Sequence, residues 1–309
     1  MDALAVILEA PEQLSLRSLA LNEPTATDIV VDIAWSGIST GTERLLWSGK
    51  MPEFPGMGYP LVPGYESVGR VVDAGAEARG RIGEWVFVPG ANCYRQARGL
   101  FGGSASRVVM PGARAVPVAE SLGANGVLVA LAATAYHAIA GHASPDLIVG
   151  HGVLGRLLAR IAVATGAPAP TVWETNAARA EGGRGYAVVH PDADDRRDYK
   201  AIYDASGDGT LLDSLIARLA RGGEVVLAGF YEKLSFTFPP AFMREARLRI
   251  AAEFLPSDLE AVTGMVASGA LSLDDLVTHI HPAADAADAY PQAFSDPACL
   301  KMVLDWNSL

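Results

Sequence analysis

The first third of the chain alternates short apolar runs with clusters of Gly, Pro, Asn and Asp. Five such runs, rich in β-branched and aromatic residues, lie at 5–8, 29–35, 67–73, 85–89 and 105–110. Short runs at this spacing, bounded by turn residues, are typical of a small β-barrel or sandwich. The pattern therefore predicts a β-rich region at the start of the chain.

From about Gly123 the pattern changes to an alternation of helix and strand. An Ala-rich helix is followed by predicted strands at 146–149, 171–173, 201–204 and 224–227, with helices at 153–165 and 211–220. Strands that are apolar on both faces are typical of a parallel sheet covered by helices. This segment therefore predicts a doubly wound parallel sheet, and the chain as a whole belongs to the α/β class.

After residue 254 the pattern changes once more. It predicts a helix at 258–268, a strand at 277–281, a helix at 283–294 and a last strand at 301–305. The chain shows no internal repeat, low-complexity tract or long linker. The elements therefore follow one another closely, as in folded domains.

Three glycines follow an apolar strand and open a helix. Gly150, Gly152 and Gly155 have the spacing GxGxxG, directly after the strand at 147–149. The first permits a tight turn, the second lets the backbone approach a pyrophosphate, and the third lets helix and strand pack closely. The free N–H groups at the helix start, including Val153 and Leu154, favour a bound anion. The motif therefore predicts dinucleotide binding.

Glu174 stands at the end of the next predicted strand. A carboxylate there can accept hydrogen bonds from both ribose hydroxyls and would repel a 2′-phosphate. The neighbouring Thr175 and Asn176 supply no cation to reverse this preference. The sequence therefore favours NAD over NADP.

Two further strand ends are expected at the same edge of the parallel sheet, where ligands of such sheets bind. Small residues follow the strands there, and a nicotinamide and its ribose could lie against them; the alternative is an ordinary strand-to-loop turn. The cofactor candidates at these turns and on the Ala-rich helix are Ala205, Ser206, Gly207, Gly229, Phe230 and Thr134.

Composition narrows the class of protein. The 309 residues include 35 acidic and 24 basic side chains, for a formal net charge of −11, so a nucleic acid partner is disfavoured. Two cysteines far apart exclude a disulfide scaffold. The N-terminus lacks a basic signal region, and the apolar stretch 127–143 is interrupted by polar residues. We expect a cytoplasmic protein that does not span a membrane.

With these motifs placed, the chain resembles the medium-chain dehydrogenase/reductase superfamily from end to end. Residues 36–43, SGISTGTE, resemble its G-I-C-x-T-D segment; 63–69, PGYESVG, its G-H-E-x-x-G segment; and 83–86, GEWV, its G-D-x-V turn. The tail at 276–303 is similar to the family's C-terminal return. The resemblance implies a GroES-like catalytic domain of residues 1–120 and 256–309, with a Rossmann NAD-binding domain, 121–255, inserted between them.

The same comparison shows what this chain lacks. Zinc members of the superfamily bind their catalytic metal through Cys, His and a further Cys or acid, and the matching positions here are Ser39, Tyr65 and Ala130. A hydroxyl, a phenol and a methyl group cannot build a tetrahedral zinc site. The region 92–103 contains one cysteine, so the family's four-cysteine lobe is absent too. We predict no metal.

Without a metal, protein groups would have to act on the reacting oxygen. The layout implied by the resemblance brings Ser39 and Tyr65 together with Thr42, Glu43, Glu66 and His137. A Tyr or His hydrogen bond with a carboxylate behind it is able to serve as general acid/base. The alternatives stay open: Tyr65 fills the space of the family's histidine, His137 is a core histidine, and the others make only turn or capping contacts.

The loop between the two family motifs is rich in aromatic residues and methionine. These side chains could line a wide apolar cleft for a large flat ligand, or pack on their own domain or on a second copy, so a homo-oligomer is compatible with the sequence. Arg44 is a candidate partner for a substrate carboxylate, together with Lys50, Arg95 and Arg98. The apolar candidates are Trp47, Met51, Phe54, Met57 and Tyr59.

Within the superfamily, the motifs without zinc ligands, the short length and the GHGVLGRLLAR loop are similar to dehydrogenases that act on chlorin-type tetrapyrroles. That resemblance implies NAD-dependent oxidation of a 3-(1-hydroxyethyl) side chain to a 3-acetyl group. Two alternatives stay open. One is a zinc-free quinone or enoyl reductase, which Glu174 disfavours because such enzymes mostly use NADPH. The other is a non-enzymatic protein that binds a nucleotide or a tetrapyrrole.

Overall fold

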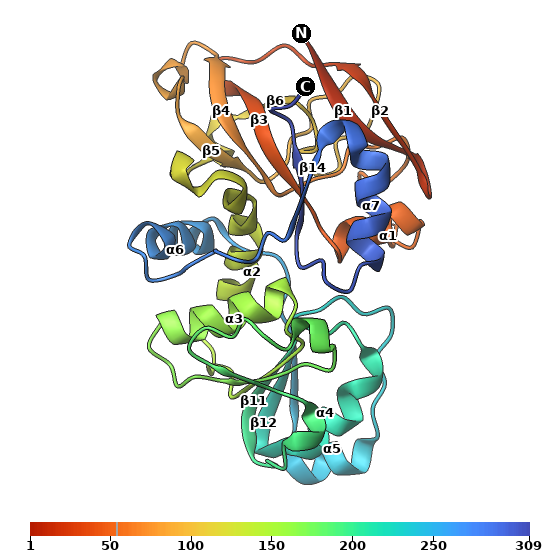
Figure 1. Ribbon diagram of the computed structural model, residues 1–309, viewed down its shortest axis with the longest axis vertical. Coiled ribbons are helices and arrows are strands. Elements are labelled where there is room, and N and C mark those ends of the chain that lie inside the picture. The colour runs from red at the N-terminus through yellow and green to blue at the C-terminus, as the bar shows by residue number, and fades with distance from the viewer. Residues whose placement is uncertain (54) are drawn as a thin grey trace. The chain divides into compact units, whose positions relative to one another are not determined.

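The chain divides into two compact units. The structure is a computed structural model and describes residues 1–53 and 55–309. The first unit contains Met1–Ala130 and Asp274–Leu309, and the second contains Leu131–Leu273. The divisions predicted from the sequence lie after residues 120 and 255. Both ends of the chain, red and blue in Figure 1, belong to the first unit, and one continuous segment forms the second.

The first unit is built on a seven-stranded sheet. Its strand order is β14-β15-β3-β4-β5-β7, with β6 also paired to β3, while β1 and β2 form a separate antiparallel pair. The strands are β1 Asp2–Ala10, β2 Gln13–Ala20, β3 Asp28–Ile38, β4 Ser67–Ala74, β5 Trp85–Val88, β6 Arg107–Pro111, β7 Val116–Pro117, β14 His279–Pro282 and β15 Met302–Asp305. The predicted β-rich region is confirmed.

Among its described residues, the first unit has two α-helices, and short 3-10 helices lie in the connections between its strands. They are α1 Thr42–Ser48 and α7 Ala286–Ser295, with the 3-10 helices η1 Arg79–Arg81, η2 Gly112–Arg114, η3 Glu120–Leu128 and η7 Ala283–Asp285. The buried side chains of β1, β3 and β6 join those of α7 and β15 in one core. Residues from both ends of the chain therefore share the same apolar interior.

The strand β3 lies at the centre of this sheet, and most of its residues are apolar. Val30 and Val31 are fully buried, and β3 pairs antiparallel with β4, β6 and β15. The sequence pattern did not predict β2. Its apolar positions Leu14, Leu16 and Leu19 depart from strict alternation, so the two-residue period of a strand is lost there.

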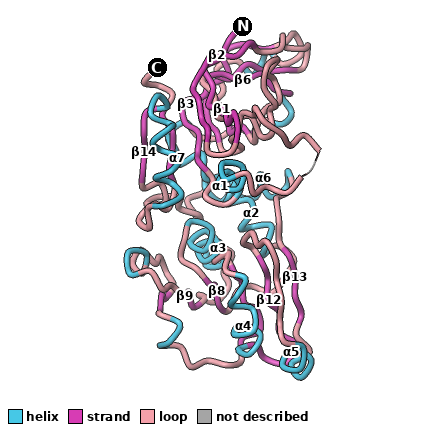
Figure 2. Tube along the Cα trace, turned by 90° about the vertical axis from the view of Figure 1, so that its right-hand side faces the viewer, coloured by secondary structure: helices cyan, strands magenta, loops and turns pink. Residues whose placement is uncertain are grey.

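The second unit is built on a six-stranded sheet with every neighbouring pair parallel (Figure 2, magenta strands). The order is β10-β9-β8-β11-β12-β13. These strands are β8 Leu147–Val149, β9 Thr171–Trp173, β10 Ala187–Val189, β11 Tyr199–Asp204, β12 Leu219–Leu227 and β13 Arg247–Ile250. The predicted Rossmann-type sheet is confirmed, with two edge strands, β10 and β13, that the pattern did not predict.

Helices precede, connect and follow the parallel strands, and those between strands form the crossover connections that a parallel sheet requires. They are α2 Val129–Ile139, α3 Val153–Ala164, α4 Leu212–Arg218, α5 Phe238–Arg244 and α6 Pro256–Ala267, with the 3-10 helices η4 Ala177–Arg179, η5 Pro191–Ala193 and η6 Gly209–Leu211. The helix predicted at 211–220 is too long, because Leu219 already pairs with Tyr199 as part of β12.

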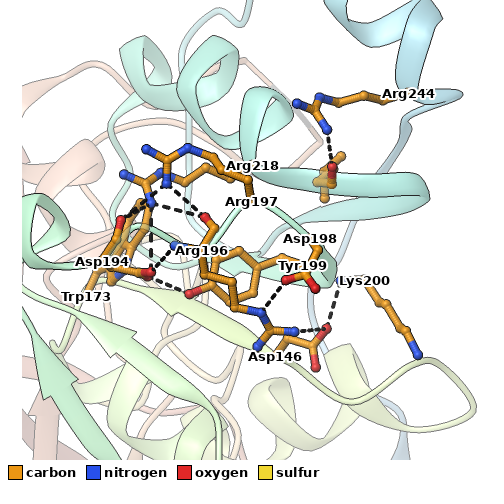
Figure 3. Close-up of polar contacts among 11 residues, drawn as sticks. Asp146, Trp173, Asp194, Arg196, Arg197, Asp198, Tyr199, Lys200, Arg218 and Arg244 are labelled. Atoms are coloured by element: carbon orange, nitrogen blue, oxygen red, sulfur yellow. Dashed lines mark hydrogen bonds and ion pairs between the residues drawn. The ribbon is translucent and has the colours of Figure 1, made fainter.

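A polar network fixes β9, β11 and α4 relative to one another (Figure 3). The Asp194 carboxylate accepts hydrogen bonds from Trp173 Nε1 at 2.6 Å and from the Tyr199 hydroxyl at 2.5 Å. The Arg218 guanidinium lies 4.4 Å from the centroid of the Trp173 ring. One carboxylate therefore joins two strands through buried donors, and the cation on α4 covers one of them.

The Ala-rich segment predicted as a buried helix forms η3 and α2. Within the described residues, Glu120–Ile139 is the one helical run long and apolar enough to cross a membrane, and 56% of its most apolar window is buried. Buried core helices of soluble proteins satisfy the same criterion. Gly123 has non-helical dihedrals, φ 52° and ψ −134°, and kinks the run near its start.

Candidate functional site

The glycine loop of the second unit has the backbone geometry that its sequence requires. Gly150 follows β8 with φ +95°, a left-handed conformation that favours glycine. A Cβ at Gly155 would lie 1.9 Å from the Gly150 carbonyl oxygen, so helix α3 approaches the loop too closely for any side chain. Gly152 precedes α3, and the nearest atom to a Cβ there would be Arg179 Nη1 at 3.9 Å.

The start of α3 presents backbone donors that the helix itself does not use. Val153 and Leu154 are its first two residues, whose N–H groups have no acceptor within the helix. The N-cap residue is Gly152, which has no side chain that could accept a hydrogen bond from these N–H groups. The loop and helix start therefore fit a pyrophosphate, whose charge the helix dipole would stabilise.

Glu174 lies immediately beyond β9, next to this loop. Its Oε2 accepts a hydrogen bond from the His151 backbone N–H at 3.0 Å. Its Oε1 accepts hydrogen bonds from the N–H groups of Thr175 at 2.8 Å and Asn176 at 2.7 Å. Because a carboxylate oxygen accepts about two hydrogen bonds, Oε2 keeps capacity for a ligand hydroxyl.

The side chain of His151 was not among the predicted site residues. It is fully buried, its Nδ1 lies 2.6 Å from the Arg179 carbonyl oxygen, and its Nε2 lies 3.0 Å from the Tyr186 hydroxyl. A carbonyl only accepts, so Nδ1 donates and Nε2 accepts from Tyr186. Burial lowers the pKa of His151 to about 4, which keeps the ring neutral. A histidine between two loop glycines was the available signal.

Arg156 holds the same region from helix α3. Its buried guanidinium donates to the His151 carbonyl at 3.0 Å and to the Glu181 carbonyl at 2.7 Å. It also donates to the Arg179 carbonyl at 3.1 Å. The segment after β9 is thus fixed over the start of α3, with its backbone oxygens satisfied by one cation.

The two predicted turns at the carboxyl ends of β11 and β12 lie against the glycine loop and each other. Ser206 Cα would be 3.3 Å from a Cβ at Gly150, and Gly207 N would be 3.0 Å from a Cβ at Gly229. The structure thus brings four cofactor candidates to one edge of the sheet. Of the others, Ala205 adjoins Ser206, Phe230 follows Gly229 and is 54% exposed, and Thr134 lies on α2 of the same unit.

The first unit contains a pair of hydroxyls at the positions that resemble zinc ligands. The Ser39 and Tyr65 hydroxyl oxygens lie 2.8 Å apart, and Tyr65 also hydrogen bonds the Thr42 side chain. The Tyr65 ring lies 5.2 Å from the Phe101 ring. Burial and the nearby Glu66 charge raise the pKa of Tyr65 well above its ordinary value. The phenol therefore stays protonated and acts through hydrogen bonds.

Two fully buried carboxyl groups lie behind these hydroxyls. The Tyr290 hydroxyl donates to Glu43 Oε2 at 2.6 Å, and Lys301 Nζ lies 2.5 Å from Glu66 Oε2. Burial raises the pKa of Glu43 to about 8, with the Glu66 charge adding to the shift and the Tyr290 hydrogen bond opposing it. Tyr290 and Lys301 had no assigned role, although both stand in the tail that resembles the family.

His137 belongs to the other unit of the chain. His137 lies on α2 in the second unit, where its Nδ1 is 2.8 Å from Asp258 Oδ2 at the start of α6. The Ser39–Tyr65 pair belongs to the first unit. A catalytic role for His137 stays a prediction.

The aromatic loop packs on its own unit. The Tyr59 hydroxyl donates to the Leu46 carbonyl, and Arg98 Nη1 donates to the Met57 carbonyl at 2.6 Å. Arg44 is exposed. Phe54 lies outside the described residues. The side chains partly buried against the core of the first unit include Trp47, Met51, Met57 and Tyr59. These side chains therefore pack on their own domain, one of the two predicted possibilities, and their substrate role stays a prediction.

The side chains at the zinc-ligand positions do not fit a zinc ion. Ser39 and Tyr65 are hydrogen bonded to one another, and Ala130 is fully buried. Among residues 1–53 and 55–309, no three His, Cys, Asp or Glu side chains gather in a way that could hold a metal ion. The two nearby acids are already contacted by Tyr290 and Lys301.

Comparison with known proteins identifies the family. The model of the alcohol dehydrogenase GroES-like domain matches residues 25–120. The 2-desacetyl-2-hydroxyethyl bacteriochlorophyllide A dehydrogenase of Cereibacter sphaeroides is 58% identical over 316 residues, covering 100% of this chain and 99% of that protein. The chain belongs to the family of this dehydrogenase. It is an oxidoreductase of the medium-chain dehydrogenase/reductase superfamily, as its motifs indicate.

A second relative has the same name and comes from Rhodobacter capsulatus. It is 58% identical to this chain over 311 residues, covering 99% of both proteins. Both relatives are dehydrogenases in name and match the chain along its whole length. The prediction of an enzyme that acts on a hydroxyl group is therefore confirmed.

Solved structures show the same fold. A short chain alcohol dehydrogenase from E. coli CFT073, complexed with NADH, has a TM-score of 0.84 at 19% identity and covers 98% of this chain and 99% of its own. A putative zinc-binding dehydrogenase from Sinorhizobium meliloti 1021, bound to NADP, has a TM-score of 0.82 at 23% identity and covers 99% of each chain. The predicted GroES-like and Rossmann fold is confirmed, and dehydrogenases of this fold bind NADH or NADP.

Proposed function

We propose that this chain oxidises the hydroxyethyl side chain of a bacteriochlorophyllide to an acetyl group, with NAD as the hydride acceptor. The observation that carries the proposal is the 58% identity to two bacteriochlorophyllide dehydrogenases over the entire chain. Identity at this level along both units supports the same substrate class as well as the same fold. The partner is thus a tetrapyrrole.

The glycine loop and Glu174 support the choice of NAD. The backbone at Gly150 and Gly152 and the N–H groups at the start of α3 would hold the pyrophosphate. The Glu174 carboxylate is fixed beside that loop by three backbone hydrogen bonds, and its charge disfavours a 2′-phosphate. When bound, NAD supplies an acceptor for the hydride of the alcohol carbon.

The hydroxyl pair of the first unit supports action on an alcohol. Tyr65 is protonated and held by Ser39, so it presents a fixed hydrogen bond where zinc members of the superfamily present a metal. A preorganised donor stabilises charge that develops on the substrate oxygen. Tyr65 and Ser39 would therefore orient the alcohol and take part in moving its proton.

The direct test incubates the purified protein with 3-(1-hydroxyethyl)bacteriochlorophyllide a and NAD. Formation of NADH together with a shift of the macrocycle's absorption is the expected result, and NADP in place of NAD should react at least about 10-fold more slowly. Absence of both signals would remove the proposed substrate. A parallel assay with a quinone and NADPH tests the alternative, a C=C or quinone reductase.

A matched variant tests the cofactor assignment by itself. In Glu174→Gln the side chain keeps one oxygen for the backbone N–H groups but loses the negative charge. We expect the ratio of kcat/KM for NAD to kcat/KM for NADP to fall by about 10-fold or more. An unchanged ratio would show that Glu174 does not select the nucleotide.

A further inference from the structure

A chain of buried hydrogen bonds in the first unit ends at Glu43. Trp306 Nε1 donates to Ser36 Oγ at 2.9 Å, and Ser36 Oγ lies 3.4 Å from Ser104 Oγ. Ser104 hydrogen bonds the Tyr290 hydroxyl, which donates to Glu43 Oε2 at 2.6 Å. The Tyr290 hydroxyl gives its one proton to Glu43, so its oxygen accepts from Ser104. The network therefore offers Glu43 a donor at one oxygen.

The other oxygen of Glu43 has no such partner. Oε1 is buried and makes no hydrogen bond within the residues that the structure describes. A buried carboxylate oxygen without a donor is costly, whereas a proton on that oxygen removes the charge. The groups that act on Glu43 are the Tyr290 hydroxyl, the negative Glu66, the positive Lys301 and the Ser39 backbone. The site thus accepts one proton at a defined atom.

Glu43 belongs to the same helical turn as the hydroxyl pair. Its N–H donates to the Ser39 carbonyl at 3.1 Å at the start of α1. The preceding residue, Thr42, hydrogen bonds Tyr65 through its side chain, and Tyr65 hydrogen bonds Ser39. Three mutually hydrogen-bonded hydroxyls and the buried acid Glu43 therefore belong to the same local structure, with the Ser39 backbone in contact with both.

We propose that Glu43 holds the proton that the alcohol loses during its oxidation. The inference rests on the proposed function. The C–H bond of the alcohol carbon breaks and its hydrogen leaves with both electrons to oxidised NAD; the O–H bond breaks, its proton passes through the Tyr65, Ser39 and Thr42 hydroxyls to Glu43, and the C=O bond forms. Glu43 acts through these hydroxyls and is a positioning residue.

The direction of the pH dependence follows from which form of Glu43 is needed. Oxidation requires the ionised carboxylate as acceptor, and reduction of the ketone requires the protonated acid. Because burial raises the pKa of Glu43 to about 8, oxidation should accelerate up to that pH and ketone reduction should slow above it. The Tyr290 hydrogen bond lowers this pKa, so its loss should move both changes to higher pH.

The experiment measures kcat/KM in both directions from about pH 6 to about pH 10 for four proteins. Glu43→Gln should lose the pH step and lower kcat for oxidation by about 10- to 100-fold with little change in KM. Tyr290→Phe should keep the step and shift it upward. Glu77→Gln removes one exposed acid of the same unit and should match the wild type.

Two outcomes would overturn the inference. One is a folded Glu43→Gln variant with the wild-type pH profile; the other is a Tyr290→Phe profile that does not shift. Infrared spectroscopy of the wild type gives a readout without turnover, because a protonated carboxyl band should disappear near pH 8 and be missing in Glu43→Gln. If that variant does not fold, the band and its shift in Tyr290→Phe decide. An inactive wild-type protein would refute the proposed function as well. If the wild type is active, the variants test the role of Glu43 alone.

Discussion

At the scale of single residues, the glycine loop brings backbone atoms so close together that no residue with a Cβ can replace Gly155 without a shift of the backbone. The Gly150 carbonyl occupies the space where a Cβ of Gly155 would stand. This loop was predictable from the sequence because its geometry depends on neighbours within six residues. The apolar strand before the loop, the spacing of the glycines and the helix after it are enough to predict this geometry.

The Gly155→Ala substitution tests this contact. Its methyl group would lie 1.9 Å from the Gly150 oxygen, so the loop or α3 must move, and we expect the Kd for NAD to rise by at least about 10-fold. Isothermal titration calorimetry measures the change. Gly264→Ala is a matched control in the same unit, because a Cβ there meets no atom within 4 Å and should leave binding unchanged.

Stability should carry the signature of the buried Glu43. The pKa of Glu43 is raised from 4.5 to about 8 in the folded protein. Between these two pH values the folded protein keeps a proton on Glu43 that the unfolded chain has released. This contribution is complete below pH 4.5 and is lost as pH rises toward 8. The free energy of unfolding should fall by about 1.4 kcal/mol per pH unit in that window, relative to Glu43→Gln. Urea unfolding of both proteins across the window checks the slope, and parallel curves would contradict it.

The other partners of the first unit's buried cluster could not be found from sequence patterns. Tyr290 lies 247 positions from Glu43, and Lys301 lies 235 positions from Glu66. Neither periodicity nor motif spacing states which buried donor meets which acid across such separations. The acids themselves stood in recognisable motifs, so the sequence identified half of each pair and the fold supplied the rest.

At the scale of elements, the central strands of the parallel sheet were predicted and its edge strands were not. The parallel strands β8, β9, β11 and β12 occupy the middle of their sheet and were all predicted. The edge strand β13 alternates arginine with apolar residues, and Leu248 and Ile250 remain exposed. An edge strand buries less surface, so its sequence carries a weaker signal.

The network around Asp194 predicts how the elements of the second unit depend on one carboxylate. Asp194→Ala would leave the Trp173 indole and the Tyr199 hydroxyl without their acceptor, and we expect a loss of about 2 to 4 kcal/mol in unfolding free energy. Thermal and urea unfolding measure it. Asp198→Ala removes an exposed acid paired with Arg196 and should cost less than about 1 kcal/mol. Equal losses would assign the effect to charge alone.

At the scale of the whole molecule, residues from the two chain ends complete one unit. Lys301 Nζ contacts both Glu66 Oε2 and the Ile38 carbonyl. The backbone N–H of Trp306 donates to the Ala34 carbonyl at 2.9 Å. The C-terminal segment therefore supplies charge neutralisation as well as a strand. The family resemblance, and not the local pattern, predicted that the ends belong together.

The Lys301→Met substitution measures this connection. It leaves the fully buried Glu66 carboxylate without its cation, and the expected loss is about 3 to 5 kcal/mol of unfolding free energy at neutral pH. The double variant Lys301→Met with Glu66→Gln removes both charges and should recover part of that loss. Failure to recover any stability would attribute the loss to packing of the lysine stem.

The pairing of β3 with β15 also has a consequence for synthesis. A ribosome adding about 5 to 20 residues per second completes β3 tens of seconds before β15 leaves the exit tunnel. The middle segment can finish its own sheet during that interval, while residues 35–38 of β3 wait without their β15 partner on the nascent chain. We expect the growing polypeptide to need shielding by a chaperone until translation ends, since an open edge invites pairing with a neighbouring polysome product.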